Sequence, residues 1–213
     1  METDNNAKDR KEQIVRGAFD ALMKNGLPDL SYDLVAEEAG LSRQLVRYHF
    51  PDHESLMVAI CDYLAQLYRD ALITSAGSLK GPERVEMFLD FYFDLLGNAP
   101  KPRDDQVYDA MMSLATRSDV VRNTLAGQYS LLGQILSHEF ELQYEEIDRR
   151  SAQELSYLFV CLMYGHWKMV SSLGFSNEHR HVTRQSMDRL IRSYENKDLP
   201  PSETVRVWET EAP

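Results

Sequence analysis

The chain of 213 residues lacks any long hydrophobic run. Its longest uninterrupted apolar stretch, YLFVCLMY at 157–164, has eight residues, whereas a helix needs about 20 to cross a bilayer. The opening residues, METDNNAKDRKEQ, are polar and do not contain the apolar stretch of a secretory signal peptide. We therefore expect a cytoplasmic protein that does not span a membrane.

Cysteine is also scarce. The two cysteines, Cys61 and Cys161, each lie inside an apolar segment and far apart in the chain. Disulfide frameworks and zinc sites need paired or closely spaced cysteines. We interpret both residues as buried thiols in a reducing compartment rather than as a disulfide or a metal pair, and we expect no metal ion and no cofactor.

Signatures of catalysis are missing as well. The sequence contains no G-x-S-x-G, no glycine-rich phosphate loop, no HExxH and no CxxC. Glu178 and His181 fit the Glu-x-x-His pattern of carboxylate-bridged metal bundles, but such bundles need two copies and further glutamates. With one copy in the chain, we expect that this protein is not an enzyme.

Positive charge is in short supply. The chain has 23 Lys and Arg against 34 Asp and Glu, for a net charge of −11, whereas nucleic-acid-binding surfaces are basic. The imbalance is uneven, because residues 8–50 carry seven basic and seven acidic side chains and are neutral. A neutral segment can bind DNA if its basic residues share one face, while acidic residues elsewhere would discourage non-specific binding.

What the sequence does contain is helical periodicity. Strand-like alternation of polar and apolar residues over a useful length is lacking, so we predict an all-α fold. Serine caps and glycine stops delimit the early helices, and a long helix without an internal breaker is suited to link two domains rigidly. The expected helices span 10–25, the segment between Ser31 and Gly40, 42–48, 52–75, 83–97, 103–117, 119–142, 149–173 and 178–195.

The most informative stretch is SYDLVAEEAGLSRQLVRYHFPDHESL at 31–56. It predicts a short helix, a tight turn at Gly40 and a second short helix, which is the arrangement of a helix-turn-helix. Ala36 and Ala39 are small enough to let the two helices cross closely. Val46 would enter the core and leave the opposite face of its helix free to enter a major groove.

This stretch resembles the N-terminal pattern of the tetracycline-repressor (TetR) family of regulators. The residues in register are Ser31, Val35, Ala36, Ala39, Gly40, Leu41, Ser42, Val46, Tyr48, His49, Phe50 and Leu56. The chain departs from the pattern at Arg47, where the family has a tyrosine that contacts a phosphate, and at His53, where it has a lysine. Arginine is at least as good a phosphate donor, whereas a neutral imidazole would grip phosphate more weakly.

The resemblance implies three regions. They are a helix-turn-helix DNA-binding domain at 8–53, a helical effector-binding and dimerisation domain at 54–196, and a loosely ordered tail at 197–213. Position on the second short helix then suggests roles, since Arg suits guanine O6/N7 and Gln suits adenine N6/N7. We expect base contacts from Arg43, Gln44 and Leu45, and backbone contacts from Ser31, Ser42, Arg47, Tyr48 and His53. Leu45 could instead pack in the core, and His49 is interpreted as a structural residue.

The segment 152–173 is apolar nearly all round, so it must be covered on both sides. One side can face its own domain and the other a second copy, as in the resembled family, although a buried core helix in a monomer would satisfy the same pattern. A dimer would read two half-sites. The expected interface residues are Leu155, Leu158, Leu162, Met187, Leu190, Ile191 and Tyr194.

The C-terminal part is also rich in Phe, Tyr and Met, which suit an apolar ligand pocket or a plain core. The resemblance implies a small-molecule inducer. Candidate pocket residues are Phe91, Tyr92, Leu95, Tyr108, Met111, Met112, Tyr129, Leu132, Phe159, Met163, His166 and Trp167. The sequence thus favours a ligand-responsive regulator that binds double-stranded DNA as a homodimer, a repressor by resemblance. The alternative is a helical module whose helix-turn-helix contacts protein.

Overall fold

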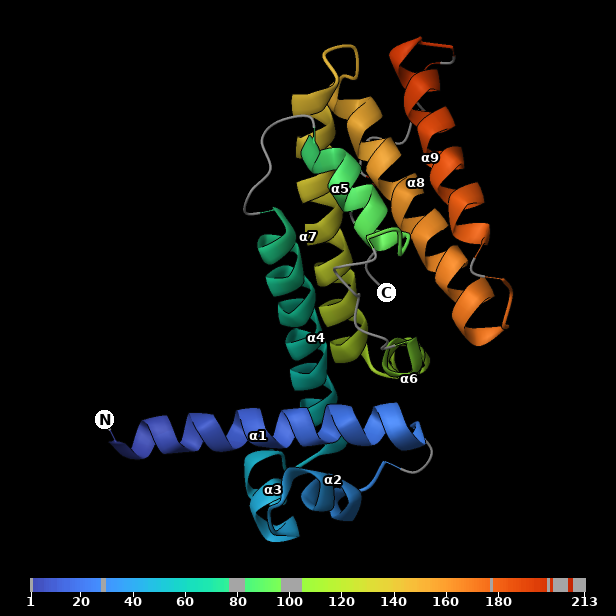
Figure 1. Ribbon diagram of the computed structural model, residues 1–213. Helices are drawn as coiled ribbons and strands as arrows, with labels where there is room; N and C mark the ends of the chain where they lie inside the picture. Colours follow the sequence, from blue (N-terminus) through green and yellow to red (C-terminus); the bar gives the residue numbers. More distant parts are fainter. Residues whose placement is uncertain are drawn as a thin grey trace. The chain divides into compact units, whose positions relative to one another are not determined.

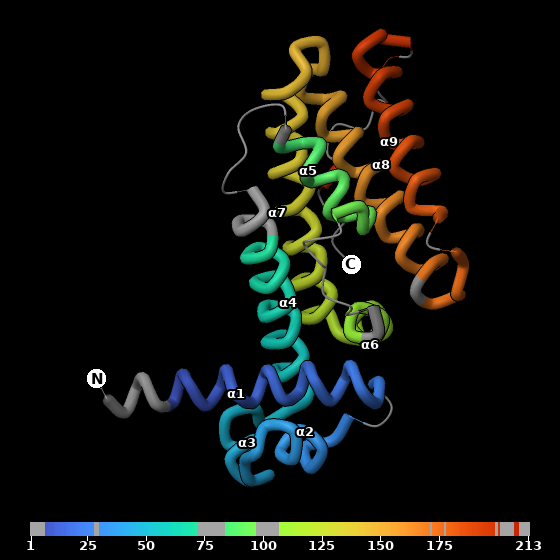
Figure 2. Tube along the Cα trace, in the orientation of Figure 1, coloured from blue at the N-terminus to red at the C-terminus, as the bar shows by residue number. Residues whose placement is uncertain are grey.

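The computed structural model describes residues 2–27, 30–76, 83–96, 105–176, 178–198, 200 and 207–208. All regular structure in these ranges is helical, which confirms the all-α prediction (Figures 1 and 2). Not one of the described helices is both long and apolar enough to span a bilayer. The helices are α1 (Glu2–Asn25), α2 (Tyr32–Ala39), α3 (Arg43–His49), α4 (His53–Ala76), α5 (Glu83–Tyr92), α6 (Asp105–Ala115), α7 (Asp119–Gln143), α8 (Arg149–Trp167) and α9 (His179–Glu195).

The chain packs as two compact units. The first comprises Met1–Leu67 with Arg103–Leu125, and the second comprises Tyr68–Pro102 with Ala126–Pro213. The divisions fall inside α4 and α7, so each of these helices contributes to both units. The regions predicted from the sequence, at 8–53, 54–196 and 197–213, concern roles and stay predictions. Much of the predicted tail, namely 199, 201–206 and 209–213, lies outside the described residues.

In the first unit, α1 lies across α2 and α3 (Figure 1). Its inner face consists of Ile14, Ala18 and Leu22, which are fully buried. The crossing with α2 is close because Gly17 has no side chain: a Cβ there would lie 2.7–2.9 Å from atoms of Ala39. The helix was predicted from residue 10 and begins at Glu2, since no glycine or proline interrupts the polar segment that precedes the apolar stripe.

Two C-terminal helix ends differ from the prediction by five or more residues. Helix α5 stops at Tyr92 and not at 97, because Asp94 takes the left-handed conformation (φ 57°) and the Leu95 amide donates to the Asp90 carbonyl at 2.8 Å. Aspartate tolerates this conformation better than most residues. Helix α8 keeps α-helical bonding only to Trp167 and widens into a π-helical turn over Lys168–Ser172. Such turns form locally within helices and are not signalled by hydrophobic periodicity.

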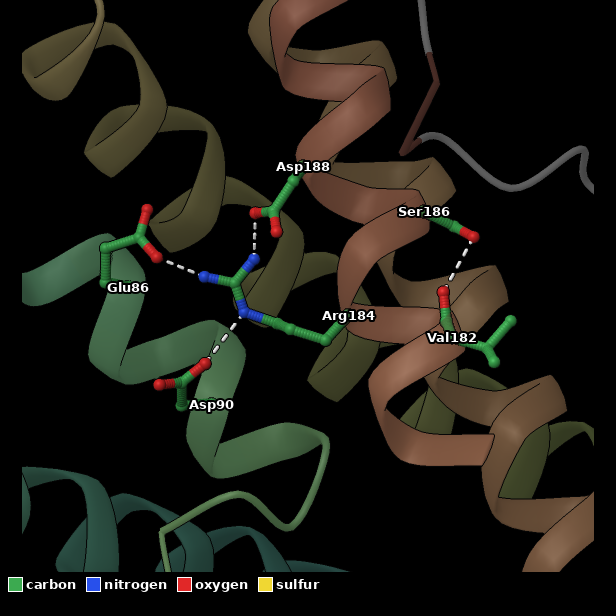
Figure 3. Close-up of polar contacts among 6 residues, drawn as sticks. All are labelled: Glu86, Asp90, Val182, Arg184, Ser186 and Asp188. Atoms are coloured by element: carbon green, nitrogen blue, oxygen red, sulfur yellow. Dashed lines mark hydrogen bonds and ion pairs between the residues drawn. The ribbon is translucent and has the colours of Figure 1, made fainter. Parts of the chain in front are cut away.

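In the second unit, α8 and α9 lie side by side (Figure 2). A buried guanidinium joins α9 to α5 (Figure 3). Nε of Arg184 donates to Asp90 Oδ1 at 2.7 Å, and its two terminal nitrogens form ion pairs with Glu86 and Asp188. Burial by itself lowers the pKa of Arg184, but the bond to Asp90 and the charges of Glu86 and Asp188 outweigh it and leave the pKa raised. The guanidinium therefore stays charged and clamps the two helices together.

Candidate functional site

The turn between α2 and α3 has the geometry that the sequence predicts. Gly40 adopts φ 64° and ψ 35°, the left-handed conformation that a side chain would disfavour. Its amide and that of Leu41 donate to carbonyls of the last turn of α2, at 3.1 and 2.9 Å. Ser31 and Ser42 each cap the following helix, accepting the amides of Leu34 and Leu45 at 3.2 Å. Both short helices are thus closed by local hydrogen bonds.

Helix α3 has one buried and one exposed face. Val46 is fully buried and holds the helix on the core, which is worth about 1.5–3 kcal/mol for a side chain of this size. On the opposite face Arg43, Gln44, Arg47 and Tyr48 are exposed, and Tyr48 retains 80% of its accessible surface. These four side chains recur at helical spacing, so they form one outward surface.

Arg43 has a partner that the sequence analysis missed. Its Nη1 lies 3.1 Å from Oδ2 of Asp33 in the first turn of α2, and both side chains are more than half exposed. An exposed pair of this kind contributes about 0–1 kcal/mol, so it can be exchanged for another acceptor. Residues ten apart on separate helices meet only once the turn is formed, and for that reason the sequence gives no local signal of the pair.

Tyr32 organises the two positions that depart from the TetR pattern. The Arg47 guanidinium carbon lies 5.6 Å from the centre of the Tyr32 ring, and the His53 ring centre lies 4.5 Å from it. Burial raises the pKa of the Tyr32 phenol, assisted by the charge of Asp52 and opposed by that of Arg47. Tyr32 therefore supports Arg47 by a cation–π contact and His53 by ring packing, a role that the sequence analysis did not assign.

The remaining predicted DNA contacts also lie at this surface. Ser31, Ser42 and His53 are exposed, and each serine uses its oxygen as an acceptor for a helix amide while keeping its hydroxyl proton for another partner. Leu45 and His49 are half-buried, so packing and contact are both compatible with their positions. All eight predicted DNA-contact residues thus lie on α3 or at the ends of α2 and α4.

The predicted pocket residues fall into both units. Tyr108, Met111 and Met112 lie on α6 in the first unit, and the Cys61 thiol approaches Met111 Sδ at 3.1 Å. The other nine lie in the second unit. Five of those nine residues are buried and belong to one network of ring contacts and hydrogen bonds. They are Phe91, Tyr92, Phe159, His166 and Trp167. Leu95, Tyr129 and Leu132 are half-buried, and Met163 is buried.

Two members of this aromatic network were not predicted. Tyr68 of α4 stacks parallel to Tyr92 at 6.3 Å and lies 6.2 Å from Trp167, while Tyr92 and Trp167 are also 6.2 Å apart. The indole Nε1 of Trp167 donates to the Tyr92 carbonyl at 2.9 Å, which fixes one side of the triangle. Phe93 packs edge-on against Phe159 and His166. Tyr68 lies four residues, or about one helical turn, after Leu64 in α4. This spacing was the feature of the sequence that could have predicted its burial.

The predicted dimer residues divide by exposure. Leu155, Met187 and Ile191 are buried inside the second unit, so they support α8 and α9 from within and cannot offer surface to another chain. Leu158, Leu162, Leu190 and Tyr194 are half-buried. Burial raises the pKa of Tyr194 to about 12, and both the negative charge of Glu154 and a hydrogen bond with that residue contribute to the rise. An interface on these helices therefore has four of the seven predicted residues available.

Known proteins match the chain in sequence and in fold. No protein-family model matches it. The HTH-type transcriptional regulator BetI of Escherichia coli is 23% identical over 165 residues, which cover 74% of this chain and 80% of BetI. A TetR transcription regulator from Haloarcula marismortui superposes with a TM-score of 0.73 at 19% identity, covering 87% of this chain and 98% of that one. This chain has the fold of the TetR-family regulators.

A further solved structure of similar fold contains a bound small molecule. A transcriptional regulator from Saccharomonospora viridis in complex with choline superposes with a TM-score of 0.69 at 18% identity, covering 87% of this chain and 96% of that one. Each of these two structures covers 87% of this chain. The resemblance that the sequence suggested over residues 31–56 is thereby confirmed for the fold of most of the chain.

Proposed function

We propose that the chain is a ligand-responsive, DNA-binding transcriptional regulator of the cytoplasm, a repressor that a small molecule releases from a palindromic operator. The observation that carries the proposal is the outward face of α3. Arg43, Gln44, Arg47 and Tyr48 project from a capped helix whose other face is anchored by Val46. The regulators that share the fold support this reading over a module that contacts protein.

On DNA, the face of α3 divides into two roles. Arg43 and Gln44, in its first turn, would contact base edges, and Leu45 would meet a thymine methyl. Arg47, Tyr48 and His53 would bind phosphates together with the hydroxyls of Ser31 and Ser42. Because Tyr32 supports both Arg47 and His53, the phosphate contacts are held in place before DNA arrives. This preorganisation reduces the entropy lost on binding.

For the effector, the aromatic network of the second unit suggests a chemical class. The faces of aromatic rings attract quaternary ammonium cations, and choline, bound by the regulator from Saccharomonospora viridis, is such a cation. Tyr68, Tyr92 and Trp167 present three rings with centres 6.2–6.3 Å apart. We infer that a small cationic effector would bind against these rings and act by favouring one of two states of the dimer.

The deciding experiment is selection of bound sites from random duplex DNA, followed by anisotropy titration of the recovered site at several salt concentrations. The proposal expects palindromic sites whose affinity falls steeply with salt, because basic side chains displace counterions from phosphates. Two half-sites would be separated by about 34 Å or more. Recovery of no preferred sequence, with no salt-dependent binding, would leave the protein-contact module as the explanation of the helix-turn-helix.

A further inference from the structure

Trp208 has a defined binding place on the second unit. Its indole Nε1 donates to Ser156 Oγ of α8 at 2.9 Å, and its ring meets the Tyr157 ring edge-on at 5.4 Å. On the other side the ring lies directly over Gly133 of α7, where any Cβ would overlap the indole. The residue falls within the segment that the sequence predicts to be loosely ordered, so the contact was not expected.

The place beneath the indole is polar and buried. Ser156 is fully buried and Ser137 nearly so, with their hydroxyl oxygens 2.9 Å apart. The Ser137 hydroxyl also lies 2.8 Å from the Gly133 carbonyl, and the Ser156 hydroxyl lies 2.8 Å from the Gln153 carbonyl. Whichever neighbour takes the Ser156 proton, the Ser156 oxygen keeps a lone pair that can accept from an N–H donor. The Trp208 indole supplies that donor.

Gly133 lowers the stability of α7, and its contact with Trp208 explains why a glycine stands there. A glycine in a helix interior is about 1 kcal/mol less favourable than alanine, and α7 continues for ten residues beyond Gly133. The missing side chain leaves room for the indole, since a Cβ there would lie 2.0–2.5 Å from atoms of the Trp208 ring. The absent Cβ, the Ser156 acceptor and the Tyr157 ring together fit a planar aromatic ring with an N–H donor, which is what the Trp208 indole supplies.

We propose that Gly133, Ser156 and Tyr157 form an indole-binding slot on α7 and α8, and that each chain fills the slot with its own Trp208. Trp208 then acts as a tethered ligand that packs against Ser156 and Tyr157 of α8. Loss of the tail, or a free indole compound in its absence, changes the occupant of the slot. This inference concerns the second unit alone and stands whether or not α3 binds DNA.

The first test follows Trp208 by ¹⁹F NMR in the full chain with 5-fluorotryptophan, which gives two resonances because the protein has two tryptophans. Trp208→Phe assigns the resonance. The Gly133→Ala variant should move it to the position of unfolded tryptophan while leaving that of Trp167. Gly127→Ala is the matched control: it adds the same methyl to the same helix at a point where nothing lies within 4 Å, so it should leave both resonances in place.

The second test replaces the occupant. Trp208→Gly should lower Tm, and indole at ten times its Kd should raise the Tm of that variant by about 3–6 °C. Benzofuran has the same shape without the N–H and should raise it less. Neither compound should stabilise the Trp208→Gly, Gly133→Ala double variant, because the added methyl fills the slot.

Three results would overturn the inference. The first is a wild-type Trp208 resonance at the unfolded position. The second is the same ¹⁹F spectrum from Gly133→Ala as from Gly127→Ala. The third is a Trp208 resonance that returns to the unfolded position on dilution, which would mean that a second copy supplies the indole.

Discussion

The guanidinium of Arg43 lies 3.1 Å from the carboxylate of Asp33, so the arginine proposed to read a base is held by an acid on the neighbouring helix. Both side chains are exposed, and the pair therefore costs little to open. Its effect on DNA is larger, because the Asp33 carboxylate stands beside a surface that would meet phosphates. We interpret Asp33 as a residue that orients Arg43 and penalises non-specific contact.

Asp33→Asn should therefore bind random DNA more tightly. A unit charge about 4 Å from another is worth about 1 kcal/mol in water, which corresponds to roughly a fivefold increase in affinity. The selected operator should gain less, since Arg43 also loses its orienting partner, and the ratio of specific to non-specific affinity should fall. Glu37→Gln removes the same charge from α2 outside this ion pair and should leave the ratio unchanged. Anisotropy with operator and random duplexes measures both quantities.

Arg43 and Arg47 should differ in what their loss does to recognition. Arg43→Ala should relax preference at one base position of each half-site, at a cost of about 1–3 kcal/mol on the preferred base. Arg47→Ala should weaken all sequences alike and reduce the salt slope by about 1, because a phosphate contact carries no sequence information. Repeating the site selection with each variant checks this. Equal loss on all sequences from both variants would show that the assigned roles are wrong.

The parts of this site that are local in sequence could be predicted, and the parts that arise from tertiary contact could not. Ser42 caps an amide three residues away, and the left-handed Gly40 follows directly from its position after α2. Asp33 reaches Arg43 only after the turn has formed, and Trp208 reaches Ser156 across 52 residues. Periodicity places Leu155 and Leu158 on an apolar helix alike but does not separate the buried one from the half-buried one.

Arg184→Met should destabilise the second unit. It removes the cation that pairs with Glu86, Asp90 and Asp188, and it leaves these three carboxylates without their shared partner. Breaking a buried ion pair costs about 3–5 kcal/mol. The carboxylates here are a third to a half exposed and partly screened, so we expect about 2–3 kcal/mol in urea unfolding. Ser186→Ala on the same helix removes only a bond to the Val182 carbonyl and should change the free energy by less than about 0.5 kcal/mol.

The free energy of unfolding should fall at alkaline pH because Cys61 is buried. Burial raises the pKa of its thiol from 9.0 to about 12, assisted by the charge of Asp62. Because the folded pKa lies above the unfolded one, the stability that this thiol contributes is complete below pH 9 and is lost as pH rises towards 12. The loss approaches about 1.4 kcal/mol per pH unit in that window. Urea unfolding between pH 8 and 11 should show a shallower decline for Cys61→Ala than for wild type, whatever the variant's stability at pH 8. Parallel curves would mean that Cys61 is hydrated in the folded protein.

Leu158→Arg should separate the proposed dimer. Leu158, Leu162, Leu190 and Tyr194 keep exposed surface on α8 and α9, and an arginine in an apolar interface would bury a charge without a partner. Sedimentation at micromolar concentration should show a dimer for wild type and a monomer for the variant, with helical content unchanged. Leu142→Arg, at a residue of α7 that is 65% exposed, adds the same charge outside the predicted interface and should remain dimeric.

Since one half-site offers too few base contacts for selectivity, the monomeric variant should also lose its preference for the full palindrome while still binding DNA weakly. A monomeric wild type, or two variants that dissociate equally, would move the interface away from these helices.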